Sequence, residues 1–156
     1  MSSSMDSASI TMIAALVFLV VMSAYFSATE TAFSSLNRVR MKSKADGGNQ
    51  RAALALELEE DYDRLLSTIL IGNNIVNITA TTVSTVLFTK LLPVYGPTVS
   101  TVVLTVIILI FGEISPKSLA KENAEDFAMF SAPILRVFIA LLRPVNFLFT
   151  QWKRLL

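Results

Sequence analysis

The sequence contains no cysteine and no histidine among its 156 residues. The side chains preferred by zinc, copper and iron–sulfur clusters are therefore missing, as are disulfides and the usual imidazole base. Charged residues are scarce at 16%, and the formal net charge of +1 gives no global field that would recruit nucleic acid. Any metal site in this chain must be built from oxygen ligands.

Of the residues, 53% are hydrophobic, which is lopsided for a soluble protein. Charge-free runs long enough to cross a hydrocarbon core of ~30 Å predict three membrane spans in one domain. These spans cover residues 8–33, 65–90 and 97–118. A signal peptide is the alternative for the first run, but no Lys or Arg precedes it and it exceeds a typical signal core.

Residues 35–64 form a polar stretch that is basic in its first half and acidic in its second. The turn residues Asp46, Gly47, Gly48 and Asn49 tolerate positive φ, so we expect a helical hairpin. Its basic residues place it in the cytoplasm by the positive-inside rule, with the N-terminus extracellular and the C-terminus cytoplasmic. The acidic run 57–63 either concentrates cations at a pathway mouth or is an ordinary solvated helix face.

The final segment, residues 122–156, predicts juxtamembrane helices that lie on the bilayer. Arg136 and Arg143 are seven residues apart on one helical face, and Pro133 and Pro144 interrupt the run. Two arginines are costly at the bilayer centre but can reach water from the interface. A fourth span would also export Lys153 and Arg154, against the charge rule.

Polar side chains recur at helical spacing inside the first span. Ser23, Ser27, Glu30 and Ser34 fall at intervals of four, three and four residues, so they share one stripe. The alternative is that Ser23 and Ser27 are small packing residues that bond back to carbonyls of their own helix, as membrane serines commonly do.

The second span carries a similar stripe of Asn73, Asn77, Thr81 and Ser84, with Asn74 beside it. A single asparagine can simply join helices by a hydrogen bond. Three asparagines within five residues favour a path for a cation or for water.

The third span ends in a proline motif that suits a cation. Pro116 has no N–H to give to the carbonyl of Gly112, and that carbonyl adjoins the carboxylate of Glu113. Glycine also allows another helix to approach closely. The alternative is a helix that merely kinks as it leaves the membrane, with Glu113 in water near Lys117.

Hydroxyl, amide, carbonyl and carboxylate oxygens are the ligands that hard cations prefer. Mg²⁺ needs a compact, near-octahedral set at ~2.0 to 2.1 Å, whereas Ca²⁺ usually takes more carboxylates, and Na⁺ is a further candidate. A single carboxylate binds weakly enough to let a transported ion leave.

Three separated segments resemble the transmembrane domain of the CNNM/CorC family of Mg²⁺ transporters. They read SAYFSATETAFSSLNRVR from residue 23, LLSTILIGNNIVN from residue 65 and FGEISPKSLA from residue 111. The resemblance implies an all-α homodimer in the cell membrane that exports Mg²⁺, with Na⁺ as candidate counter-ion. It also implies a cytoplasmic pair of CBS domains beyond residue 156.

Carried over by motif, the resemblance implies six metal ligands, with Glu30 at the cytoplasmic end of the pathway and Asn74 the least well supported. The six are Ser23, Ser27, Asn73, Asn77, Gly112 and Glu113.

Two other functions fit parts of the sequence. A membrane anchor could sense Mg²⁺ for a cytoplasmic part without moving the ion. A serine hydrolase would need Ser115 or Ser118 with Lys117 as base, but no glycine-rich elbow or oxyanion motif accompanies them, so we expect no enzyme.

Overall fold

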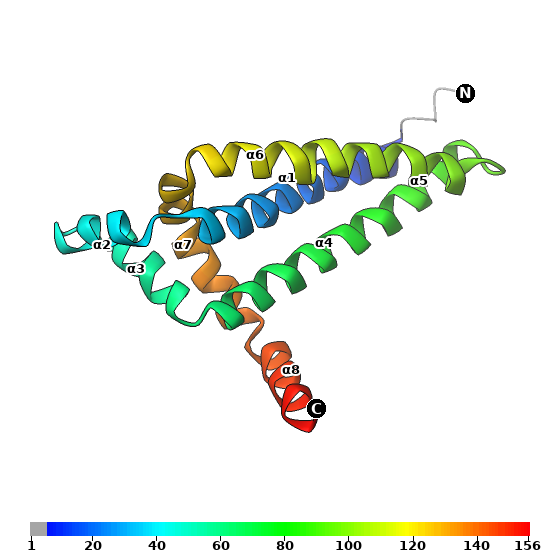
Figure 1. The fold of residues 1–156 in the computed structure, drawn as a ribbon. Helices are drawn as coiled ribbons and strands as arrows, with labels where there is room; N and C mark the ends of the chain where they lie inside the picture. Colours follow the sequence, from blue (N-terminus) through cyan, green and yellow to red (C-terminus); the bar gives the residue numbers. More distant parts are fainter. Residues whose placement is uncertain (1–5) are drawn as a thin grey trace. The chain divides into compact units, whose positions relative to one another are not determined.

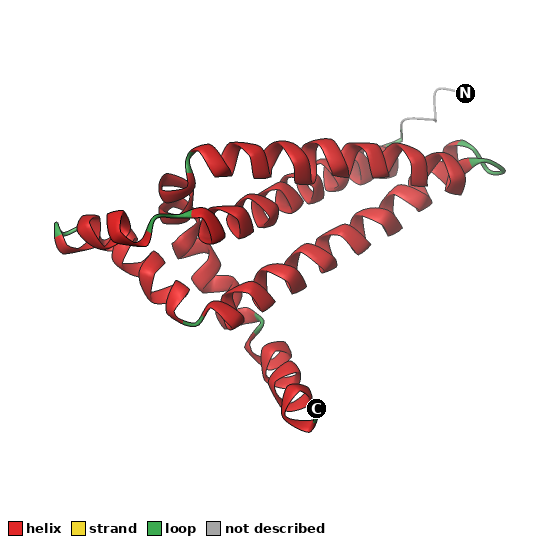
Figure 2. Ribbon diagram, viewed as in Figure 1, coloured by secondary structure: helices red, strands yellow, loops and turns green. Residues whose placement is uncertain are grey.

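The computed structural model describes residues 6–156, and these residues are helical with no β-strand (Figures 1 and 2). This confirms the predicted all-α class. Residues 1–5, the predicted extracellular N-terminus, lie outside the described residues.

Three helices are long and apolar enough to cross a membrane. They are α1 (Ser7–Ser35), α4 (Tyr62–Leu91) and the continuous run Gly96–Glu122. The run consists of α5 (Gly96–Ile107), the π-helical segment η2 (Ile108–Ile114) and α6 (Ser115–Glu122). At ~1.5 Å per residue each exceeds the ~30 Å hydrocarbon core. The three predicted spans lie within these helices.

The chain divides into two compact units, and α1 and α4 each contribute to both. The first unit comprises residues 6–27 and 73–117, and the second comprises residues 28–72 and 118–156. In the first unit, Lys90 Nζ lies 2.7 Å from Asp6 Oδ2, and the buried hydroxyls of Ser84 and Ser100 are 2.6 Å apart. These contacts join α4 to the start of α1 and to α5.

The predicted hairpin consists of α2 (Arg38–Asp46) and α3 (Gln50–Glu60) in the second unit. Gly48 adopts φ 100°, and it is the one described residue with positive φ. Asn49 instead caps α3, because its side chain accepts hydrogen bonds from the N–H groups of Arg51 and Ala52. The turn therefore uses one glycine for conformation and one asparagine for capping.

Helix α3 packs on α7 (Ala124–Leu141) through small side chains. Ala52 and Ala55 of α3 and Ala128 and Ala132 of α7 are all fully buried. Small residues let two backbones approach closely, which favours this packing in an apolar setting. An ion pair between Arg40 of α2 and Glu125 of α7, 3.2 Å apart, joins α2 to α7 as well.

Helix α7 is followed by α8 (Arg143–Leu155) after a bend of 68°. By length and composition, the pair would form a fourth span only if both helices crossed the membrane together. Pro133 lies inside α7, whereas Pro144 lies in the first turn of α8, where its missing N–H costs nothing.

Candidate functional site

The first feature of the site is a polar contact between α1 and α4. Ser23 is 1% exposed, and its hydroxyl donates to Asn73 Oδ1 at 3.3 Å. The bond is longer than the ~2.7–2.8 Å typical of hydroxyl donors, so it is a weak one. Ser34 of the same stripe instead bonds back to the Glu30 carbonyl at 2.6 Å. Ser34 therefore bonds within α1, whereas Ser23, for which back-bonding was the alternative, reaches another helix.

Gly112 of η2 lies against the same serine. Gly112 is buried, and a Cβ added to it would stand 3.0 Å from Ser23 Oγ. Such a contact is too tight for a side chain without a shift of Ser23, so only glycine fits comfortably here. The predicted close approach of another helix at Gly112 is therefore present, and three spans meet at Ser23.

The backbone around Gly112 departs from α-helical geometry. Residues Ile108–Ile114 are π-helical, and the N–H of Ser115 bonds to the carbonyl of Ile110, five residues back. Pro116, four residues after Gly112, cannot donate to it. The sequence suggested that Pro116 kinks the helix. In the structure, Ile108–Ile114 form a wider, π-helical stretch within one continuous helix. Such π-segments recur at functional sites because they loosen the backbone ladder.

The other three predicted ligands are neighbours of this trio along the same helices. Ser27 is buried one turn along α1, and Asn77 lies one turn along α4 with its Oδ1 buried and without a hydrogen-bond partner. Glu113 follows Gly112 and is half-buried. Within the described part of the chain, none of these three makes a direct hydrogen bond to Ser23, Asn73 or Gly112.

The remaining polar groups of the α4 stripe serve structure. The Thr81 hydroxyl donates to the Asn77 carbonyl at 2.9 Å, and Ser84 pairs with Ser100. Within the stripe, Asn73 bonds to α1, Thr81 bonds within α4 and Ser84 bonds to α5.

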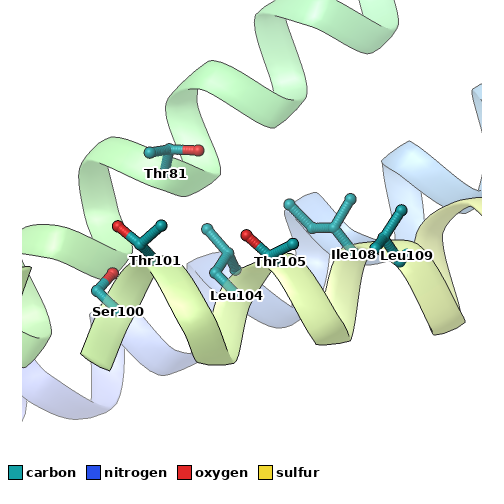
Figure 3. Close-up of a pocket in the computed structure, with 7 residues that line it drawn as sticks. All are labelled: Thr81, Ser100, Thr101, Leu104, Thr105, Ile108 and Leu109. Atoms are coloured by element: carbon teal, nitrogen blue, oxygen red, sulfur yellow. The ribbon is translucent and has the colours of Figure 1, made fainter. Parts of the chain in front are cut away.

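A recess of about 200 Å³ lies between α4 and α5 in the first unit (Figure 3). Figure 3 shows Thr101 and Thr105 one turn apart on α5, with Thr81 on the facing helix. Ile108, the first residue of η2, also lines it. None of the six predicted ligands is among the described residues that line this recess.

Carboxylates do not gather at the site. Across residues 6–156 there is no group of three or more His, Cys, Asp or Glu side chains that could hold a metal. Hydroxyl and amide oxygens with one nearby carboxylate suit a hard cation and no soft one.

The comparison with known proteins identifies the family. The family model described as the Cyclin M transmembrane N-terminal domain, CNNM, matches residues 14–156. The chain belongs to the CNNM transmembrane-domain family. This bears out the resemblance that the three motifs carry.

Relatives in bacteria and plants agree with the CNNM assignment. The chain is 39% identical to a UPF0053 protein of Haemophilus influenzae, over 85% of this chain and 32% of the relative. It is 38% identical to the UPF0053 inner membrane protein YfjD of Escherichia coli, over 86% of this chain and 31% of the relative. A chloroplastic DUF21 domain-containing protein of Arabidopsis thaliana is 34% identical, over 72% of this chain and 17% of the relative.

The chain spans about a third of the length of the bacterial relatives. Its CNNM membership and its three candidate spans make it a multi-pass membrane domain.

One buried polar contact escaped the sequence reasoning. Asn146 of α8 is buried, and its Nδ2 donates to Thr68 Oγ1 of α4 at 3.0 Å in the second unit. The signal was present, because Asn146 is a lone amide in the segment PVNFLF of an otherwise apolar stretch.

Proposed function

We propose that this CNNM domain transports Mg²⁺ across the membrane, with the ion held between the three spans. The observation that carries the proposal is the meeting of Ser23, Asn73 and Gly112 from three different helices. Ser27, Asn77 and Glu113 complete the ligand set in this proposal.

The spacing of the oxygens supports a small cation. Neighbouring ligands of an octahedral Mg²⁺ at ~2.0–2.1 Å lie about 2.9 Å apart. The 3.3 Å between Ser23 Oγ and Asn73 Oδ1 needs only a small closure to reach this value. A bound ion would replace a weak hydrogen bond and give the orphaned Asn77 Oδ1 a partner.

The low charge of the proposed ligands favours release of the ion as well as binding. Five of the six ligands are neutral oxygens, and Glu113 alone supplies a charge. A transported ion must leave its site, so a single carboxylate is an advantage that a storage site would not need.

The assembly and orientation belong to the same proposal. We infer a homodimer with an extracellular N-terminus, a cytoplasmic C-terminus, juxtamembrane helices on the bilayer and Mg²⁺ export against Na⁺. CBS domains in the remainder of the full-length protein would be its cytoplasmic partners. The resemblance to the CNNM/CorC transporters and the distribution of Lys and Arg support these statements.

The test is Mg²⁺ flux in liposomes that contain the purified chain and an entrapped Mg²⁺ indicator. The expected result is saturable flux that Glu113→Gln abolishes, with calorimetric Mg²⁺ binding reduced in the same variant. Binding without flux would show a sensor instead. Covalent labelling by a serine-directed hydrolase probe would contradict our inference that the chain is not an enzyme.

A further inference from the structure

The second unit contains an open recess of about 670 Å³ where α4 begins and α8 passes it. Asp61, Asp63, Arg64 and Ser67 line it from α4 and its preceding turn, and Arg143, Asn146 and Arg154 line it from α8. Arg64 is the last charged residue before the charge-free run 65–89. The recess therefore lies where α4 passes from polar surroundings into the apolar layer, which is headgroup depth.

Two of the cationic side chains that line the recess are not paired with a described carboxylate. Arg64 is paired with Asp61 at 3.5 Å, and Lys153 with Asp63 at 3.8 Å. Arg143 and Arg154 are exposed and have no ion-pair partner among the described residues. Two free guanidinium groups at one opening favour a phosphate, which they can bind with paired hydrogen bonds.

Asn146 fixes α8 against α4 beside the recess. It is 8% exposed, and its Nδ2 is used by Thr68, whose own hydroxyl donates to the carbonyl of Arg64. The remaining amide oxygen, Oδ1, is buried without a partner. The amide therefore anchors α8 to α4 through Thr68, and it holds Arg143, three residues earlier on α8, in place beside the recess.

An apolar groove adjoins the recess. It is lined by Ala140, Arg143, Pro144, Phe147 and Leu148, and it shares Arg143 and Phe147 with the recess. Phe147 and Leu148 are each more than half exposed. A ligand that fits both features has an anionic head and a hydrocarbon tail.

We propose that the recess binds the headgroup of an anionic phospholipid, such as phosphatidylglycerol, with an acyl chain in the adjoining groove. The proposal does not depend on Mg²⁺ transport, because it uses no residue of that site. Arg143 and Arg154, which both line the recess, bind the anionic headgroup.

The single tryptophan, Trp152, allows a direct test because it lies between two residues that line the recess, Gln151 and Lys153. The chain is reconstituted in phosphatidylcholine vesicles containing a minor fraction of brominated phosphatidylglycerol, phosphatidylethanolamine or phosphatidylcholine. Quenching of Trp152 then gives the relative association of each lipid. We expect phosphatidylglycerol to be preferred over both zwitterionic lipids.

Paired variants assign the preference to the recess. Arg143→Gln with Arg154→Gln should lower it about fivefold for each arginine, as expected for one basic residue near a membrane surface. Arg143→Lys with Arg154→Lys should keep only part of it, because lysine keeps the charge but cannot form the paired hydrogen bonds of a guanidinium. The matched control, Lys42→Gln with Lys44→Gln, removes equal charge from α2 and should leave it unchanged.

Three results would overturn the proposal. One is an unchanged preference in the double glutamine variant. Another is an equal loss in the α2 control, which would indicate general surface charge. The third is equal quenching of the unsubstituted chain by brominated phosphatidylglycerol and brominated phosphatidylcholine.

Discussion

Ser23 and Ser84 are both buried serines that hydrogen-bond from one helix to another. Replacing each of them by alanine separates an effect on ion binding from an effect on helix packing. Ser23→Ala should weaken Mg²⁺ binding at least about tenfold, because a lost bond to a charged group costs ~1.5–3 kcal/mol. Ser84→Ala should leave binding unchanged and cost only ~0.6 to 2 kcal/mol of stability. Calorimetry and thermal unfolding in detergent measure both, and equal losses of affinity would contradict the site.

Gly112→Ala tests the close approach of the helices. The added methyl group would stand 3.0 Å from Ser23 Oγ, and a side chain can yield where backbone cannot. We therefore expect a folded protein in which Ser23 is displaced and Mg²⁺ no longer raises the melting temperature. Gly47→Ala, whose Cβ would meet atoms only at 3.5 Å, is the control. A full Mg²⁺-dependent shift in the Gly112 variant would show that Ser23 is not a ligand.

Single residues also mark the limit of sequence reasoning at this site. Periodicity places Ser23 and Ser34 on one stripe, but a hydroxyl at fixed spacing can bond to its own helix or to a neighbour. Only the packing of α1, α4 and η2 separates them. The close approach at Gly112 was predictable, because a glycine inside a span has no side chain and lets a neighbouring helix come near.

At the level of elements, η2 is the least regular part of a long helix, and its wide turn holds one residue more than an α-helix would. Deleting exposed Leu109 should restore α geometry while keeping both flanking segments in phase. We expect a folded protein without Mg²⁺-dependent stabilisation. The control is deletion of exposed Val102 in regular α5, which should rotate the rest of the helix and destabilise it. Retained Mg²⁺ stabilisation without Leu109 would show that η2 is dispensable.

The ends of α1 and α4 are joined by a pH-sensitive contact. The hydrogen bond from Lys90 is the main cause that lowers the pKa of Asp6 from 3.8 to about 2, and the Ser9 N–H adds to it. Because the folded-state pKa is depressed, the contact stabilises the protein above about pH 3.8 and loses this effect as the pH falls toward 2. The melting-temperature difference between the native chain and Asp6→Asn should therefore vanish over that window. A pH-independent difference would contradict it.

Most elements were predictable because their signals are local. Charge-free runs gave the three spans, and the Asp46 to Asn49 turn gave the hairpin. The π-helical form of η2 and the 68° bend between α7 and α8 were not predictable in the same way. Both depend on how several turns share their hydrogen bonds and packing, which composition does not record.

For the whole molecule, the absence of native cysteine makes the topology directly testable. Gly47→Cys lies in the hairpin turn, and Val94→Cys lies between α4 and α5. The proposed orientation predicts that an impermeant maleimide labels Val94→Cys in intact cells and Gly47→Cys only after permeabilisation. The reverse pattern would invert the orientation. The cysteine-free chain is the control.

The contact between Gly112 and Ser23 also makes these two positions epistatic. One space is shared by two helices, so the effect of a substitution at either position depends on the residue at the other. Gly112→Ser alone should clash, and Ser23→Gly alone should leave a void. The two together would return the hydroxyl to the same space from the opposite helix. We therefore expect substitutions at these two positions to occur together in evolution, because either substitution alone is unfavourable.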